Sequence, residues 1–464
     1  MSKLMIARIE FLRNNYKQLL FLILLSFIGT MWVEHIGEEG VYTISTLEML
    51  AAKKWSYPLL LGGSYDRPAL FNWLIMIPTY LWLQSEGVLQ AARLVVILAT
   101  MGSAFIVYKL GDLLFKDDDV ALFSMFAYLS GDVLMRRGWL AYADPVFAVF
   151  VLLGVYFLWR WVLQGNIANI IVSTVFINLA VLSKTYTAFL FYIAPILYFI
   201  SNDKYRNKIF NKSFMMITSM AICLPLIIWS EQSSSGGNFI YNVKQNLQGI
   251  SVGSYLYKIM SFPVLIMLLS APLSFIVVFA LIKERGIQKN KMLIACFVIL
   301  LLSLLPYWVV PQEAKARYLL PAMPWVALSI GYCLVNLSSS YLRAINVMII
   351  VTIVVKLLIT PWFYYQQTNI KGNTTLAAKD ILRITQSRHP IFIHDSTAKE
   401  LRLSAALNLQ MLPRLVKAVE WRHTQNYYYL SATKNEQQEL AKYYIERSWI
   451  YLYCANLACK PHID

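Results

Sequence analysis

Long apolar segments, repeated from the N-terminal region to about residue 363, are the feature that most limits how this chain can fold. Hydrophobic residues make up 58% of the 464 residues and charged residues 14%, whereas soluble proteins have about 45–50% apolar and about 25% charged residues. Backbone groups inside a bilayer must be hydrogen-bonded within the chain, so such segments predict membrane-spanning helices. The expected class is an all-α polytopic membrane protein.

The basic loops predict the topology, because Lys and Arg concentrate in cytoplasmic loops. The N-terminal residues 1–17 are basic, and residues 201–213 and 282–290 are the densest basic loops between apolar segments. All three are cytoplasmic only if the short apolar stretch 68–83 lies along the membrane interface instead of crossing. We therefore expect eleven spans and an extracytoplasmic C-terminal region. The spans are expected at roughly residues 18–36, 91–114, 119–135, 145–163, 167–184, 186–200, 214–230, 259–282, 292–310, 318–337 and 342–363.

The net charge of +16 has two readings, a nucleic-acid partner or basic membrane loops. The basic residues sit between apolar runs, which favours membrane loops and no nucleic-acid partner. The sequence has no P-loop and no GxGxxG, and its five histidines lack zinc-ligand spacing. An enzyme of this kind needs a substrate that is already activated and already in the membrane.

The residues after Trp362 change character and predict a second domain. Residues 389–396, 426–432 and 448–454 are typical of short strands, while residues 397–410 and 435–444 are interpreted as helices. We expect a transmembrane domain over 1–363 and a small extracytoplasmic α/β domain over 364–464. Cys454 and Cys459 could pair there or remain free thiols.

Three acidic residues on the expected outer face are candidate catalytic groups. Glu38 and Glu39 follow the first apolar segment, and Asp144 precedes another. Each could cap a helix N-terminus, where acids are stabilised. Facing a polar cavity, the same carboxylates could act as a base or an orienting group.

Cations on the same face could hold a phosphate. Each one alone is typical of a lipid-headgroup contact, but together they could form a clamp for a phosphate or diphosphate. The candidates for phosphate binding are Arg67, Lys184, Lys315 and Arg317, and the further candidates for substrate contact are Tyr42, Asp66 and Arg137.

The stretch "EEGVYTISTLEMLAAKKWSYPLLLGGSYDRPALFNWL" resembles the first outer loop of GT-C glycosyltransferases that use polyprenyl-phosphate sugars, the lipid A aminoarabinose transferase and protein O-mannosyltransferase group. "RRGWLAYADPVFAVFVLL" resembles their second outer loop, and "AVLSKTYTAFLFYIAPIL" and "ARYLLPAMPWVALSIG" resemble later landmarks. The resemblance implies the GT-C fold with interfacial helices in the first outer loop. It also implies that Glu38 and Asp144 are the acids of the two loops and that Arg67 replaces a lysine on the carrier phosphate.

The resemblance further implies inverting transfer of one sugar to lipid A, another envelope glycan or a protein, on the periplasmic face of a bacterial inner membrane. A divalent cation is left open. Two alternatives remain: a carrier or flippase for lipid-linked sugars, and a scaffold protein whose outer tail recruits partners. The scaffold predicts that Glu38, Arg67 and Asp144 tolerate substitution, and the carrier predicts that no glycosidic bond is made.

Overall fold

The computed structural model describes residues 3–65, 67–83, 85–220, 252–283, 290–310, 315–337, 339–394, 397–418 and 426–455. The chain forms two compact units, and each unit is built from separate chain segments. Unit 1 comprises Met1–Phe27, Val96–Trp139 and Ala143–Lys356, and unit 2 comprises Ile28–Val95, Leu140–Tyr142 and Leu357–Asp464. Unit 2 combines the C-terminal residues with residues 28–95, so it does not correspond to a C-terminal domain alone. The domain boundary predicted after residue 363 stays a prediction.

Unit 1 is helical, and polar caps mark where its helices begin. The Asp117 side chain accepts hydrogen bonds from two backbone N–H groups of α5, and Asn166 and Asn290 cap α8 and α15 in the same way. The helices with described bounds that lie wholly or mainly in unit 1 include α1 (Lys3–Ile28), α4 (Val88–Phe115), α5 (Asp118–Ser130), α6 (Asp132–Arg137), α7 (Ala143–Gln164), α8 (Ile167–Ser183), α9 (Ala188–Ser201), α10 (Asp203–Ile209), α13 (Val252–Leu269), α14 (Leu273–Lys283), α15 (Lys291–Val309), η3 (Ala316–Ala322), α16 (Met323–Val335) and α17 (Ser339–Tyr365).

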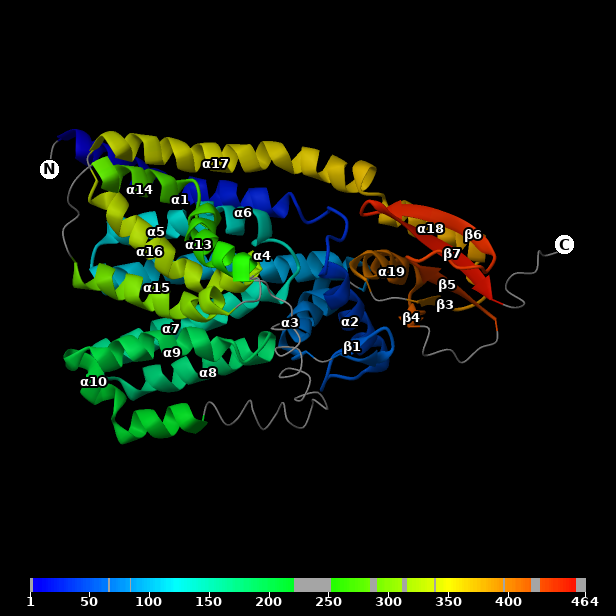
Figure 1. Ribbon diagram of the computed structural model, residues 1–464, viewed down its shortest axis with the longest axis horizontal. Helices are drawn as coiled ribbons and strands as arrows, with labels where there is room; N and C mark the ends of the chain where they lie inside the picture. The colour runs from blue at the N-terminus through cyan, green and yellow to red at the C-terminus, as the bar shows by residue number, and fades with distance from the viewer. Residues whose placement is uncertain are drawn as a thin grey trace. The chain divides into compact units, whose positions relative to one another are not determined.

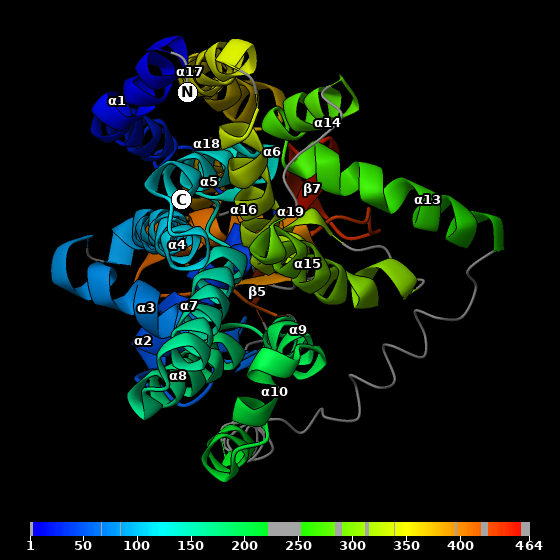
Figure 2. The same cartoon turned by 90° about the vertical axis from the view of Figure 1, so that its left-hand side faces the viewer.

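The α7–α8 pair shows how these helices pack. Both views show the two helices side by side (Figures 1 and 2). The Ser173 hydroxyl of α8 donates a hydrogen bond of 2.6 Å to the Gly154 carbonyl of α7, and it lies 2.8 Å from the Tyr192 hydroxyl of α9. A polar side chain inside an apolar bundle is thus satisfied by a neighbouring helix, as membrane helices require.

Five helices in the described part of the chain are long and apolar enough to cross a membrane. A sixth results if α13 and α14, which meet at 112°, form one broken span. The segment 68–83 contains α3 (Leu70–Pro78) and a π-helical turn η1 (Thr79–Leu83), and α3 is shorter than a crossing needs. The total of eleven spans and the interfacial position of this segment stay predictions.

Unit 2 contains the segment after the first apolar run and a C-terminal sheet. The first part holds α2 (Glu39–Ala52), the short hairpin β1 (Leu59–Leu60) and β2 (Gly63–Ser64), α3, η1 and η2 (Ser85–Gly87). The second part holds η4 (Gln366–Ile370), α18 (Thr374–Thr385), β3 (Ile391–Ile393), α19 (Ala398–Met411), β4 (Lys417–Ala418), β5 (Tyr427–Ser431), β6 (Glu439–Ile445) and β7 (Ser448–Ala455).

The sheet has the order β4-β3-β5-β7-β6, with parallel pairing of β3 to β4 and β5 and antiparallel pairing around β7. Figure 1 shows α19 next to both α2 and the sheet. One buried apolar cluster joins Ile44 of α2, Ile381 of α18, Leu407 of α19 and Leu430 of β5. The two parts of unit 2, far apart in sequence, therefore share a core.

The helix predicted over residues 435–444 is wrong, whereas the strands at 391–393, 427–431 and 448–455 and the helix at 398–411 are confirmed. Residues 439–445 form β6, which pairs with β7. Glu446 and Arg447 between them have φ of 50° and 67°, typical of a two-residue type I′ hairpin turn. Pairing with β7 outweighs the helix preference of this segment. Cys459, with which Cys454 could pair, lies outside the described residues.

Candidate active site

The turn that opens α2 is held by a buried ion pair between Glu39 and Arg93 of α4. The Arg93 Nε–H and Nη2–H groups donate to the two Glu39 carboxylate oxygens at 2.9 and 2.6 Å, and both side chains are fully buried. The Glu39 oxygens also accept hydrogen bonds from the backbone N–H groups of Ile36 and Ala141 at 2.8 and 2.7 Å. Both oxygens of Glu39 are therefore occupied by donors of the protein.

Arg93 also organises the backbone that leads into this turn. Its guanidinium donates to the carbonyl oxygens of Thr30, Met31, Val33 and Glu34 at 2.5 to 3.1 Å. Carbonyls of an irregular segment must find donors when they are buried. Arg93 supplies these donors and thereby stabilises the backbone conformation of residues 30–34.

Glu38 stands beside this pair as the N-cap residue of α2, and its partly buried side chain makes no capping hydrogen bond. Tyr42 lies one turn further and packs edge-on against Phe71, with ring centroids 5.0 Å apart. Glu38 and Glu39 stand at the N-terminus of a helix, as the capping alternative expects. Glu38 thus lies next to Glu39, which holds the turn through Arg93.

Arg67 is exposed and lies three residues before α3. The preceding hairpin is anchored by Glu48 of α2, whose carboxylate accepts hydrogen bonds from the Gly62 N–H at 3.0 and 3.2 Å. Burial raises the pKa of Glu48 to about 7. Asp66 lies outside the described residues.

Unit 1 brings three of the predicted residues together. The Lys184 ammonium lies 2.5 Å from one carboxylate oxygen of Asp144, and the Arg317 Nε lies 3.9 Å from the other. The Lys184 ammonium also sits over the Tyr318 ring, 4.1 Å from its centroid. These three charged side chains are at most 11% exposed.

Each of the three charged residues of this cluster lies at the end of a helix. Asp144 lies in the first turn of α7, Lys184 is the residue that ends α8, and Arg317 lies in the first turn of η3. The capping alternative for Asp144 is therefore compatible with its ion pairs. Two cations share one carboxylate, so the cluster has a net positive charge in a buried position. Such a site attracts an anion, and the planar arginine fork suits phosphate oxygens.

Two other predicted residues lie near this cluster in sequence. Lys315 is exposed and immediately precedes η3, and Arg137 is half-buried in the last turn of α6. Within the part of the chain that the structure describes, no group of three or more His, Cys, Asp or Glu side chains could hold a metal ion.

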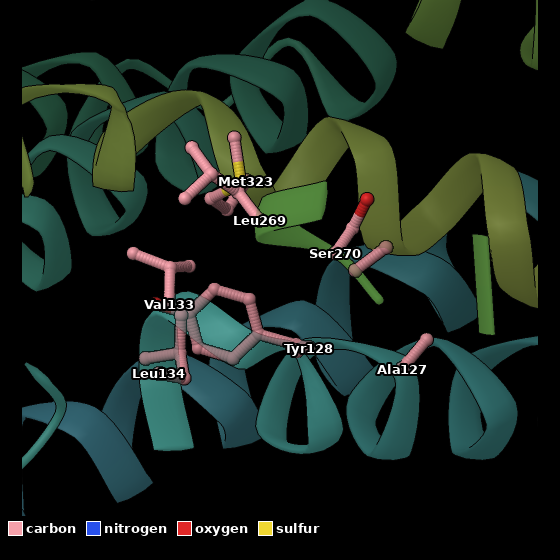
Figure 3. Close-up of a pocket in the computed structure, with 9 residues that line it drawn as sticks. Ala127, Tyr128, Val133, Leu134, Leu269, Ser270 and Met323 are labelled. Atoms are coloured by element: carbon pink, nitrogen blue, oxygen red, sulfur yellow. The ribbon is translucent and has the colours of Figure 1, made fainter. Parts of the chain in front are cut away.

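A small cavity between α5, α6, α13 and α16 is a separate feature. Figure 3 shows the side chains of Val133, Leu134, Leu269 and Met323 around it. Its volume of about 10 Å³ is room for roughly one water molecule. It cannot hold a sugar or a lipid phosphate, so we do not include it in the site.

Sequence reasoning missed Arg93 and Tyr318. Arg93 interrupts an apolar helix, and an ionisable residue inside an apolar run is itself a signal of a buried partner. Tyr318 carries no such signal, because aromatic residues are frequent throughout this chain.

Comparison with known proteins gives matches in sequence and in structure. The family model described as dolichyl-phosphate-mannose-protein mannosyltransferase matches residues 66–229. The undecaprenyl phosphate-alpha-4-amino-4-deoxy-L-arabinose arabinosyl transferase 1 of Proteus mirabilis is 28% identical over 148 residues, which are 31% of this chain and 26% of that protein. The aligned region thus spans about a quarter of the curated relative.

The similarity in structure extends over nearly the whole chain. The crystal structure of ArnT from Cupriavidus metallidurans bound to undecaprenyl phosphate superimposes with a TM-score of 0.73 at 14% identity, covering 98% of this chain and 99% of that one. The apo structure of the same protein gives 0.67 at 13% identity, covering 97% and 99%. The chain has the fold of these structures, and it resembles GT-C glycosyltransferases that use polyprenyl-phosphate sugars.

Proposed function

We propose that this protein is an integral membrane glycosyltransferase that moves one sugar from a polyprenyl-phosphate donor to an acceptor in the cell envelope. The observation that carries the proposal is the buried cluster of Lys184, Arg317 and Asp144, in which two cations share one carboxylate. The similarity to a protein crystallised with undecaprenyl phosphate supports a lipid phosphate as the anion. The acceptor is lipid A, another envelope glycan or a protein.

In this proposal the cations act on the leaving group. An acceptor oxygen attacks the anomeric carbon, the bond from that carbon to the phosphate oxygen breaks, and the carrier phosphate leaves with the electron pair. Lys184 and Arg317 stabilise the charge that develops on this phosphate, and they do so strongly because little water reaches them. Lys315 and Arg67 provide further phosphate contacts. Attack opposite the leaving group inverts the anomeric centre.

The acids have different roles in this proposal. Glu38 takes the proton of an acceptor hydroxyl or orients it, as a carboxylate in a catalytic site can do. Asp144 holds Lys184 in place, and Glu39 fixes the turn that carries Glu38. If the acceptor is a phosphate, no base is needed and Glu38 only orients it. Substrate contacts by Tyr42, Asp66 and Arg137 complete the site.

The proposed location is a bacterial inner membrane, with the N-terminus in the cytoplasm and the C-terminal sheet in the periplasm. The basic loops support this orientation through the positive-inside rule. Labelling of single cysteines placed at residues 2 and 434 in intact spheroplasts tests it.

The deciding experiment compares the envelope molecules of the source cell with and without the gene, and with Glu38→Gln or Lys184→Met copies. Mass spectrometry of lipid A, glycans and periplasmic proteins should reveal one sugar that the wild-type copy restores and the variants do not. Removing one transition-state contact costs about 10²–10³ in rate. Arg136→Met is the matched control, since Arg136 is 75% exposed in its pair with Asp132.

Assays with the purified protein then distinguish a glycosyltransferase from a carrier of lipid-linked sugars. A transferase forms a new glycosidic bond in detergent with donor and acceptor lipids, whereas a carrier only moves labelled donor between leaflets of a vesicle. Undiminished transfer by both Glu38→Gln and Lys184→Met would refute the assigned site, and movement without bond formation would refute the transferase.

A further inference from the structure

A second buried arginine, Arg402 of α19, lies between two acids of unit 2. It is fully buried, with its Nη2 3.6 Å from a Glu34 carboxylate oxygen and its Nη1 3.3 Å from a Glu446 carboxylate oxygen. Its Nε and Nη2 groups have no hydrogen-bond partner within the described residues. A buried guanidinium needs opposite charge close by, so the position of Arg402 depends on both acids.

Glu34 is tied to α18 as well. Its carboxylate accepts hydrogen bonds from the Thr374 N–H and hydroxyl, both at 2.9 Å, and from the Thr375 N–H at 3.3 Å. An acid suits the N-terminus of a helix, where backbone N–H groups are unpaired. The residue four positions before Glu38 is therefore bound by two helices of the C-terminal region.

The backbone of α19 also lies directly against the turn. A β-carbon on Gly40 would be 2.7 Å from the Leu401 carbonyl oxygen and 3.3 Å from the Arg402 nitrogen. Gly40 is two residues after Glu38, so α19 meets the first turn of α2 beside the candidate catalytic acid. The same turn is also held by Arg93 through Glu39.

We propose that Arg402 and Glu34 are positioning residues, through which α19 sets the place of the Glu38 carboxylate. The C-terminal sheet is then a part of the active-site framework and not an added module. The effect on transfer rests on the proposed function, whereas the effect on the turn does not.

The test uses the full-length protein in detergent, with Arg402→Met, which keeps an unbranched apolar stem and removes the charged guanidinium. Arg383→Met is the matched control, because Arg383 belongs to the same region and is 82% exposed in its pair with Asp380. Hydrogen exchange of the peptide covering residues 36–42 should be at least about tenfold faster in Arg402→Met and unchanged in the control, since local opening frees its amides.

Kinetics separate positioning from stability. We expect kcat per folded molecule to fall about 100-fold, the cost of a displacement of roughly 1 Å at a reacting group. The KM for the donor should not change, because Lys184 and Arg317 are untouched. In a Glu38→Gln background, Arg402→Met should add little, since the carboxylate it positions is already absent.

Three results would overturn the proposal: unchanged exchange at residues 36–42, unchanged kcat in the folded variant, or an equal loss with and without Glu38. If Arg402→Met does not fold, Arg402→Lys keeps the charge but not the fork, and the same measurements apply to it. If the wild type transfers no sugar, the proposed function fails, and the exchange experiment still decides whether α19 fixes the turn.

Discussion

Replacing Arg93 with Met should destabilise the protein strongly, because this fully buried side chain makes six hydrogen bonds. Two go to Glu39 and four to carbonyl oxygens of residues 30–34. The change leaves a carboxylate buried at 0% exposure with only two backbone donors. Breaking a buried ion pair in this way costs about 3–5 kcal/mol, a large share of the roughly 5–15 kcal/mol typical of folded proteins.

Thermal unfolding of the purified protein in detergent, followed by intrinsic fluorescence, measures this loss. The Arg93→Met variant should unfold several degrees below wild type, and Arg136→Met should not differ, since exposed pairs contribute less than about 1 kcal/mol.

A double variant sharpens the interpretation. Combining Glu39→Gln with Arg93→Met leaves no unpaired buried charge, so the double variant should be more stable than the sum of the single losses predicts. If Arg93→Met unfolds at the wild-type temperature, or if the two losses simply add, then the pair does not hold the turn.

Three further predictions concern unit 2. Burial raises the pKa of Glu48 from 4.5 to about 7. The folded protein therefore keeps a proton that the unfolded chain loses between pH 4.5 and 7, so the free energy of unfolding falls across this window by about 3 kcal/mol. Glu48→Gln should flatten the dependence of the melting temperature on pH there, and an unchanged dependence would assign it to other groups. Gly40→Ala should destabilise by about 1–3 kcal/mol in thermal unfolding, because α19 leaves no room for the methyl group; a wild-type melting temperature would contradict the tight contact. Gly372→Ala should lose more stability than Gly165→Ala in the same assay. Both glycines have positive φ, but a β-carbon on Gly372 would clash with the Tyr444 carbonyl, whereas one on Gly165 would meet no atom within 4 Å. Equal losses would mean that the unfavourable backbone conformation alone determines the effect.

Much of the fold could be predicted because it depends on local patterns. Most of the expected apolar segments contain a helix within the described residues, although α1 ends at Ile28 and not at residue 36. Residues 221–230 of the span expected at 214–230 lie outside the described residues. The aromatic residues at 427–429 and at 449, 451 and 453 predict strands. The segment at 439–445 could not be assigned from its own residues, since its strand exists through pairing with β7.

The candidate site was predictable in its residue types and not in its partners. Loop topology placed Asp144, Lys184 and Arg317 on one face, and the structure brings these three together. The different roles of the neighbouring residues Glu38 and Glu39 could not be predicted from the sequence. The role of Glu39 depends on its ion pair with Arg93, which lies 54 positions later in the chain. Such contacts are set by packing between distant segments, which a local pattern does not contain.

The discontinuity of unit 2 has a consequence for how the protein is made. Arg93 lies 54 residues after its partner Glu39 in the sequence. Thr374, whose N–H and hydroxyl bind Glu34, lies 340 residues after Glu34. At about 5–20 residues per second, the ribosome delivers Thr374 roughly 17–68 s after Glu34. During that time Arg93 is already synthesised and can hold the turn through Glu39, whereas α18 and α19 are still missing. Nascent chains that stop before α19 would therefore carry every candidate catalytic residue and still lack the helix that aligns Glu38, so activity would begin only near the end of synthesis.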